Sequence, residues 1–226
     1  MKLILFGNGG IAELANFYFE NDSEHKVAAF AVDGEHLDAN TFMEKPLIAF
    51  EEVSGKYPPD DFGMFIALSY TKLNQVRQDK FIAAKELGYR LPSFISSQSA
   101  TASDLEIGEN CFILENQTIQ PFCRIGDNVT LWSGNHIGHH SSIADHTFIS
   151  SHVVISGYCD IGERCFLGVN ATLRDNCVIG DDAFVGMAAV VTTDVAAGSV
   201  VLGQSSEVLP VDDRRARALK RTYFKI

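Results

Sequence analysis

The sequence lacks a long apolar run and is poor in basic residues. None of its apolar stretches approaches the roughly 18 residues of a membrane-spanning helix, so a membrane is not an expected partner. Lysine and arginine number 18 against 29 aspartates and glutamates, and this net charge of −11 argues against nucleic acid as a partner. The amino-terminal MKLILFG has too short an apolar stretch for a signal peptide, so we expect a cytoplasmic protein.

Cysteine is present without any useful pairing pattern. Five cysteines, an odd number without a C-x-x-C motif, exclude the framework of a disulfide scaffold or a zinc ribbon. The basic residues are concentrated at the carboxyl end, where RRARALKRTYFK holds six of the eighteen. We expect a short helical tail there.

A six-residue repeat runs from Ile107 to Leu202. The first position of its sixteen units is Ile, Leu or Val except at Ala197, and the second is Gly in eight units. All five cysteines occupy the fifth position, where a free cysteine serves as a small buried hydrophobe. A period of six is neither that of a strand nor that of a helix, and it predicts a short strand and a bend, repeated. We therefore expect the cysteines to be packing residues and not nucleophiles or metal ligands.

The first hundred residues alternate apolar strands with helices, which predicts a small parallel sheet of the Rossmann type. The first strand is followed by a glycine loop and the second by a carboxylate; these residues are Gly7, Asn8, Gly9, Gly10 and Asp33. Such a loop lets backbone N–H groups approach a phosphate, and such a carboxylate accepts from a ribose or a base. The alternative is purely structural: the glycines start a helix, and Asp33 belongs to a turn.

The hexads resemble those of the hexapeptide-repeat transferases, which fold as a left-handed parallel β-helix. Together with the opening F-G-x-G-G-x-A, they make the chain similar to bacterial sugar acyltransferases that acetylate nucleotide-linked amino sugars, a group that includes the sialic acid O-acetyltransferase-like proteins. The resemblance implies a Rossmann-like nucleotide-sugar-binding domain at 1–98, a left-handed β-helix acyltransferase domain at 99–204 and the helical tail at 205–226. We expect the last strand of the small sheet at 90–96.

The same resemblance implies an assembly and a set of ligands. Three hexads should form each coil of a triangular prism, with the small domain covering one end and the carboxyl-terminal helix the other. Family members are usually homotrimers with active sites in the clefts between neighbouring prisms. Acetyl-CoA is the expected co-substrate, no metal is expected, and the glycine loop with Asp33 would hold the nucleotide of a UDP-, GDP- or dTDP-sugar.

The stretch NHIGHHSS contains the candidate catalytic residues. The family's base lies at a third hexad position, which is His139 here, and an acidic residue usually follows it; here the next residue is His140. The group that orients the base therefore stays open between His136, Asp145 and a residue of a neighbouring subunit. The histidines at fourth positions should lie on three different sides of one coil, which disfavours a metal site within one chain; they are His140, His146 and His152.

Gly157 follows His139 by eighteen residues and should stack one coil away. The resemblance gives its N–H the role of oxyanion donor to the thioester carbonyl. Gly168, Asn170 and Met187 are candidate contacts for the pantetheine of CoA, and they suit a pure scaffold equally well. The family's G-x-P-A-K ending is replaced by GQSS at 203–206. The basic tail could then meet the 3′-phosphate of CoA or be a solvated helix face, and we favour the solvated face.

The resemblance thus implies direct transfer of an acetyl group from acetyl-CoA to the amine of a nucleotide-linked amino sugar, with His139 as general base. One alternative is O-acetylation of a sugar. Another is a trimeric zinc carbonic anhydrase of the γ type, although no two histidines of the cluster show that family's spacing of five. The third is an inactive scaffold.

Overall fold

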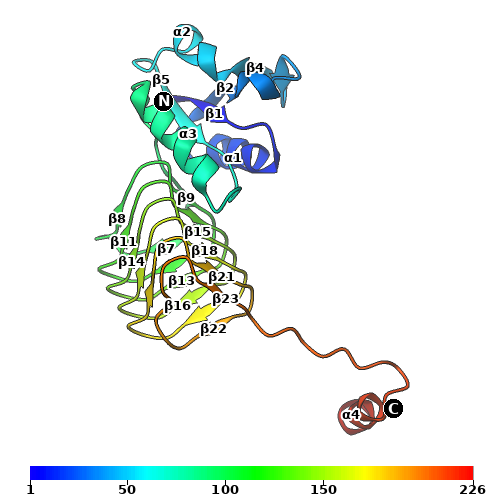
Figure 1. Cartoon of the computed structure of the whole chain (residues 1–226). Coiled ribbons are helices and arrows are strands. Elements are labelled where there is room, and N and C mark those ends of the chain that lie inside the picture. The colour runs from blue at the N-terminus through cyan, green and yellow to red at the C-terminus, as the bar shows by residue number, and fades with distance from the viewer. Residues whose placement is uncertain (226) are drawn as a thin grey trace.

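The computed structural model describes residues 1–225. A small α/β domain sits at one end of a prism of stacked coils, and an extended segment leads from the other end to a separate helix (Figure 1). No helix within the described part of the chain is both long and apolar enough to cross a bilayer.

The small domain is the predicted Rossmann-like sheet with some additions. Its elements are β1 (Lys2–Phe6), α1 (Gly10–Asn21), β2 (Lys26–Val32), a 3-10 turn (Gly34–His36), β3 (Thr41–Phe42), β4 (Lys45–Ala49), a second 3-10 turn (Phe50–Glu52), α2 (Val53–Lys56), β5 (Phe62–Ile66) and α3 (Gln75–Glu86). The strand order is β3-β4-β2-β1-β5, parallel except for β3. The sequence prediction omitted β3 and β4. The first has only two residues, and the second contains Pro46, a residue that is unfavourable inside a sheet.

The prism consists of two-residue strands joined by tight corners. The strands are β6 (Phe94–Ile95), β7 (Ala100–Thr101), β8 (Glu106–Ile107), β9 (Phe112–Ile113), β10 (Thr118–Ile119), β11 (Arg124–Ile125), β12 (Thr130–Leu131), β13 (His136–Ile137), β14 (Ser142–Ile143), β15 (Phe148–Ile149), β16 (Val154–Ile155), β17 (Asp160–Ile161), β18 (Phe166–Leu167), β19 (Thr172–Leu173), β20 (Val178–Ile179), β21 (Phe184–Val185), β22 (Val190–Val191) and β23 (Val200–Val201). Every third strand pairs in parallel, so three sheets form the three faces. We call them the β13 face (β7, β10, β13, β16, β19, β22), the β14 face (β8, β11, β14, β17, β20) and the β15 face (β6, β9, β12, β15, β18, β21, β23).

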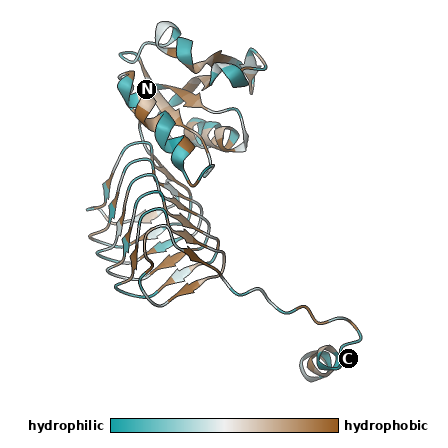
Figure 2. Cartoon of the chain, viewed as in Figure 1, coloured by the Kyte–Doolittle hydropathy of each residue, from teal (hydrophilic) through white to brown (hydrophobic). Residues whose placement is uncertain are grey.

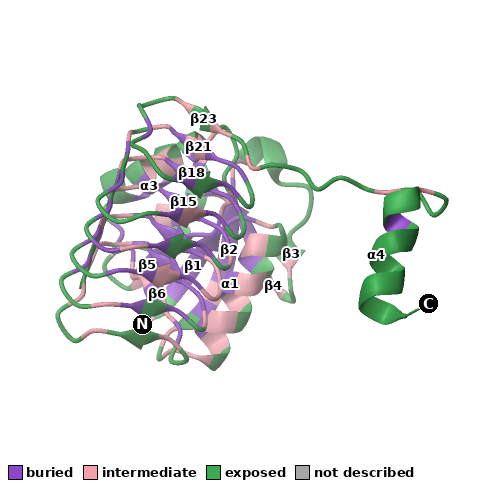
Figure 3. Ribbon diagram, turned by 90° about the horizontal axis from the view of Figure 1, so that it is seen from below, coloured by how far each residue is buried: buried purple, intermediate pink, exposed green. Residues whose placement is uncertain are grey.

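The core of the prism is built from the first and fifth hexad positions, as predicted. All five cysteines are free and buried, and the first-position Ile, Leu and Val residues from Ile113 to Val191 are buried with them. Buried residues recur along the coils of the prism, and exposed residues lie at many of its corners (Figure 3). The hydropathy follows the same division, with apolar strands and polar corners (Figure 2). Burial of these side chains supplies the main stabilisation of the stack.

The fourth hexad position turns each corner in a left-handed backbone conformation. Positive φ angles recur there every six residues, with Gly134 as the one glycine in a series that otherwise runs from Asn110 to Ala188. Asn, Asp and His tolerate this conformation better than most residues, which explains why Asn recurs at this position. The three fourth-position histidines have φ values of 59°, 64° and 59° at residues 140, 146 and 152.

The prism begins earlier than expected. Phe94–Ile95 forms β6 and pairs with β9, so this segment is the first rung of the β15 face and not the last strand of the small sheet. Only Arg90, through an isolated bridge to Gly63, extends the small sheet. The predicted boundary between residues 98 and 99 is therefore wrong, because Ile95 already occupies a first hexad position.

The repeat also ends differently. Val195 pairs with Ile179 and Val201 with Val185, sixteen residues apart instead of eighteen. The last coil is thus two residues short, which removes Ala197 from the first position and explains its departure from the pattern.

Beyond the last coil, α4 (Arg214–Phe224) is capped by Asp213 and stands apart from the prism (Figure 1). The expectation that this helix covers the prism end is wrong.

Candidate active site

His139 and His140 lie at the corner between β13 and β14, outside the core. Both residues are exposed, and their Nδ1 atoms are 3.1 Å apart. The backbone N–H of His139 donates to Oε1 of Gln120 at 2.9 Å. The predicted base therefore faces solvent from a fixed turn, with the other histidine as its hydrogen-bond partner.

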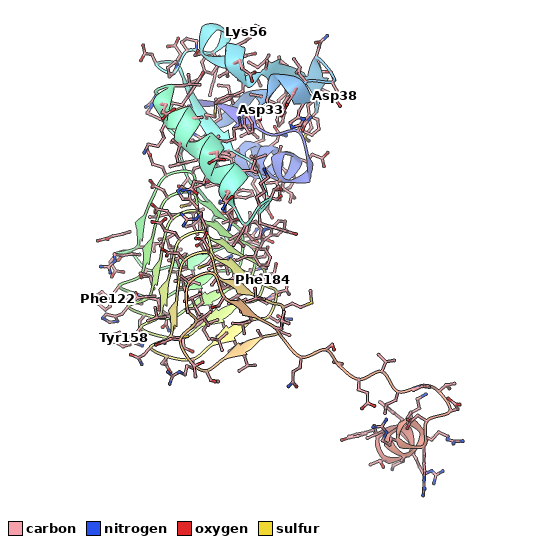
Figure 4. All side chains as sticks on the ribbon, viewed as in Figure 1. Asp33, Asp38, Lys56, Phe122, Tyr158 and Phe184 are labelled. Carbon is pink, nitrogen blue, oxygen red and sulfur yellow. The ribbon has the colours of Figure 1, made fainter. Side chains whose placement is uncertain are left out.

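An aromatic column holds the second of these imidazoles. The ring of His140 stacks on Tyr158 with centroids 4.7 Å apart and an interplanar angle of 18°, and it lies 4.6 Å from Phe122 on its other side. All three residues occupy fourth positions one coil apart, and Phe122 and Tyr158 mark this edge of the prism in Figure 4. Tyr158 also meets the ring of His139 edge-on at 5.0 Å.

Gly157 stacks on His139 as predicted but does not present a free donor. Its N–H donates to Oδ1 of Asp175 at 2.9 Å, so in this structure the group already has an acceptor. The glycine has another reason to be there: a Cβ on it would come within 2.9 Å of Cε1 of His139. Because Gly157 has no side chain, the imidazole of His139 can occupy this position.

The other histidines lie elsewhere. His146, at the corner between β14 and β15, is only 6% exposed, and its Nδ1 atom is 3.0 Å from Nδ2 of Asn128. His152 turns the corner between β15 and β16, and His136 belongs to the β13 face. Asp145 accepts from the N–H of Asp127 at a different corner from His139. Among residues 1–225, no hydrogen bond joins His136 or Asp145 to the candidate base. In the same range no three His, Cys, Asp or Glu side chains gather as for a metal.

The glycine loop connects β1 to α1. Gly7 has φ +131°, and a Cβ there would lie 2.7 Å from the carbonyl oxygen of Ala67, so only glycine fits. Gly9 caps α1, and within the described residues no side chain bonds to the cap. A Cβ on Gly9 or Gly10 would meet no described atom within 4 Å. The amino terminus of α1 is therefore open, which suits an anion.

A cavity of about 250 Å³ adjoins this loop and includes Asp33. Its lining is formed by Phe6, Gly7, Asn8, Val32, Asp33, His36, Leu68 and Val76. Sequence reasoning missed Lys80, which forms an ion pair with Asp33. The ammonium of Lys80 also lies 5.3 Å from the ring centroid of Phe6 and 5.2 Å from that of Phe50. Asp33, labelled in Figure 4, thus has a cationic partner already.

The small domain packs against the β15 face. Tyr70 meets Phe148 and Phe166 at centroid distances of 5.0 and 4.8 Å, and Tyr18 meets Phe94 at 5.4 Å. A second cavity of about 360 Å³ lies at this junction; its lining is Ile11, Ser69, Tyr70, Trp132, Phe148, Ser150, Ser151 and Val169. In a triangular prism the corner of His139 is opposite this face.

The expected CoA contacts lie at yet another corner. Gly168, Asn170 and Met187 belong to the turns between the β15 and β13 faces, and Met187 is 73% exposed. A Cβ on Gly168 would come within 2.6 Å of the N atom of Met187, so close coil stacking accounts for this glycine. Within one chain these residues do not form one site with His139.

Comparison with known proteins agrees with this architecture. Residues 104–139, 122–157 and 158–193 match the family model described as bacterial transferase hexapeptide (six repeats). The matched residues cover most of the prism and none of the small domain. No curated protein matches the chain by sequence.

Solved structures match nearly the whole chain. A mutant of perosamine N-acetyltransferase from Caulobacter crescentus, in complex with CoA and GDP-perosamine, gives a TM-score of 0.81 at 20% identity, covering 90% of this chain and 98% of that chain. The acetyltransferase domain of PglB from Neisseria gonorrhoeae gives 0.76 at 20% identity, over 92% and 99%. WeeI from Acinetobacter baumannii gives 0.68 at 22% identity, over 92% and 100%. The shared feature is the complete fold, a Rossmann-like domain followed by a left-handed β-helix.

Proposed function

We propose that this protein is a cytoplasmic, homotrimeric acetyltransferase that moves an acetyl group from acetyl-CoA to the amine of a nucleotide-linked amino sugar. The observation that carries the proposal is the placement of His139, an exposed imidazole fixed above Gly157 on a prism that also bears an open glycine loop. Two of the similar structures, including a complex with CoA and GDP-perosamine, come from a perosamine N-acetyltransferase.

The nucleotide is assigned to the small domain. The cavity of about 250 Å³ would take the nucleoside, and the amino terminus of α1 would hold the diphosphate. The second cavity begins at Ile11 on the other side of the same loop, so the sugar would emerge along the β15 face. Lys80 adds a cation beside Asp33 at the nucleoside end.

A site built in this way needs a second subunit. The sugar would emerge over the β15 face, whereas His139 lies at the opposite corner of its own prism. An acceptor amine can therefore meet an imidazole only from a neighbouring chain. This geometry supports the homotrimer, with the corner of one prism facing the β15 face of the next.

The chemistry requires one proton acceptor. Nε2 of neutral His139 takes a proton from the amine as its nitrogen attacks the thioester carbonyl carbon. The C–N bond forms, the tetrahedral intermediate collapses, and the C–S bond breaks. The proton held on His139 then passes to the departing CoA thiolate, which leaves the imidazole neutral and the amide complete. We assign no covalent intermediate, because all five cysteines are buried and free.

A panel of UDP-, GDP- and dTDP-linked amino sugars with acetyl-CoA tests the proposal, with products identified by mass spectrometry. We expect an acetyl product from one nucleotide class, stable to mild base as an amide is. A base-labile acetyl ester would establish O-acetylation instead. His139→Asn should lower kcat about 100- to 10,000-fold while KM changes little. Full turnover by His139→Asn would show that the base lies elsewhere.

The zinc alternative needs its own measurement. Zinc would have to bind histidines from two chains, and a metal assay on the purified assembly measures this directly. Stoichiometric zinc, together with loss of activity on chelation, would contradict the proposed direct transfer.

A further inference from the structure

We propose that His140 positions the catalytic base by accepting a hydrogen bond from Nδ1–H of His139, so that Nε2 of His139 is the proton acceptor. The catalytic role assigned to this pair of histidines rests on the proposed function. The pairing of the two rings rests on the geometry alone: His140 is the hydrogen-bond partner of His139. The carboxylates of this corner, Asp104 and Asp175, accept from backbone N–H groups instead.

Two neutral imidazoles can share this contact in only one way at a time. The Nδ1 atoms are 3.1 Å apart, so one nitrogen donates and the other accepts. If His139 donates, its Nε2 carries a lone pair and serves as a base. If His140 donates, Nε2 of His139 carries the proton and the ring is no base. After His139 takes up a proton at Nε2, the Nδ1–H bond to His140 is unchanged, so proton transfer needs no rearrangement on that side.

The second ring is held more firmly than the first. It lies between Tyr158 and Phe122 in the aromatic column, with centroid distances of 4.7 and 4.6 Å. Its backbone is fixed by the left-handed corner, with φ 59°, and by a hydrogen bond from its N–H to the carbonyl oxygen of Pro121. A ring clamped on both faces and at its backbone can orient the neighbouring side chain, which is what a positioning residue must do.

A neutral partner differs from a carboxylate in its charge. A carboxylate would attract the imidazolium form of His139, whereas an imidazole accepts the hydrogen bond without a charge. The other ionisable groups of this corner are the Tyr158 hydroxyl, Arg174, and the carboxylates of Asp104 and Asp175, which accept from backbone N–H groups of Phe122 and Gly157.

Three substitutions at position 140 separate stacking from hydrogen bonding. Phe, Asn and Asp each occur at a fourth position of this chain with positive φ, at Phe122, Asn116 and Asp182, so each is compatible with the corner. His140→Phe keeps the stack and removes the acceptor. His140→Asn keeps an acceptor without the imidazole ring. His140→Asp supplies a charged acceptor.

We expect His140→Phe to lower kcat about 10- to 100-fold with both KM values within about two-fold of the original. His140→Asn should recover most of that loss. His140→Asp should retain turnover and move the acid limb of the pH–rate profile to higher pH by about one unit. Unchanged kcat in His140→Phe, or equal losses in His140→Phe and His140→Asn, would overturn the proposal.

Long-range proton–nitrogen NMR of the full-length protein tests the pairing without any substrate. His139→Asn identifies the resonances of His139, and His140→Phe provides the unpaired reference. We expect the proton of neutral His139 on Nδ1 in the original protein and a shift toward Nε2–H in His140→Phe. A proton on Nε2 in the original protein would overturn the inference even if the enzyme acetylates its sugar. If the proton of His139 is on Nδ1 but the protein has no transferase activity, the proposed function is rejected and the pairing of His139 with His140 still stands.

Discussion

The guanidinium of Arg77 donates a hydrogen bond of 2.9 Å to the carbonyl oxygen of His146, joining α3 of the small domain to a corner of the prism. The same guanidinium donates to the carbonyl of Asn128 and to the hydroxyl of Thr130. Arg77 is buried, and among residues 1–225 it meets these oxygens without a carboxylate partner. The contact fixes the small domain on the prism, and with it the position of the cavity beside Asp33 relative to the β15 face.

Arg77→Met should lower the free energy of unfolding by about 3 kcal/mol, because several buried carbonyl oxygens would lose their donor. Denaturant titration measures the change. Arg90→Met, at an exposed side chain of the same domain, is the matched control and should change little. Equal effects of the two substitutions would contradict the role given to Arg77.

Burial lowers the pKa of His146 below its ordinary value of 6.5. The unfolded chain then binds a proton that the folded chain does not, so the full stability is present above about pH 6.5 and is lost as the pH falls through the lowered pKa. We expect Tm to drop between about pH 7 and pH 5, and to drop less in His146→Asn, since Asn128 shows that Asn fits this corner.

The exposed His152 supplies the control for that measurement, because His152→Asn makes the same change at another corner. Burial lowers the pKa of His25 as well, so part of the pH dependence should remain in His146→Asn. An unaltered dependence in His146→Asn would contradict the prediction.

Gly157→Ala should displace the base without unfolding the prism. The new methyl would come within 2.9 Å of the His139 ring, which is exposed and can swing away. We expect kcat to fall about 100-fold and Tm to change by little, as measured by steady-state kinetics and thermal melting. Gly55→Ala, where a Cβ meets no described atom within 4 Å, controls for glycine replacement in general. Wild-type kcat in Gly157→Ala would show that the position of the imidazole does not matter.

Gly10→Ala distinguishes a phosphate loop from a mere helix start. A Cβ at this position would touch no described atom within 4 Å, and alanine favours the helix, so Tm should stay equal or rise. If a diphosphate approaches this backbone, the methyl should raise KM for the nucleotide sugar about ten-fold while KM for acetyl-CoA is unchanged. Unaltered kinetics would favour the structural interpretation of the loop.

The prism could be predicted from the sequence because a strict six-residue repeat is compatible with few arrangements of the backbone. The buried cysteines, the first-position aliphatic residues and the stacking of Gly157 on His139 all follow from the frame of six. The frame also misled at its end, since two residues are missing from the last coil and the pattern alone gives no sign of this before Ala197. At the start, Ile95 fits the six-residue frame, but the alternation of strands and helices before it led to the assignment of 90–96 to the small sheet.

Two features carried a signal that was overlooked. Asn recurs at the fourth position, as in Asn110 and Asn116, and marks the left-handed corners; the histidines at this position follow the same backbone rule. Phenylalanines also recur at sixth positions of the β15 face, as in Phe148 and Phe166, and predict a covered face. Lys80 and Arg77 gave no such signal, because their partners come from distant parts of the chain that only the folded structure brings together.

The two ends of the prism bear on self-association. An eighteen-residue period could in principle continue from one column into another, because each open rung presents unpaired backbone groups. The final rung, built on Val195 and Val201, is two residues out of step with that period. Val195 and Val201 nevertheless pair in parallel with the rung before them, so the missing residues shorten a corner and leave the ladder in place. The small domain at the opposite end of the prism is what would stand in the way of head-to-tail growth into a filament.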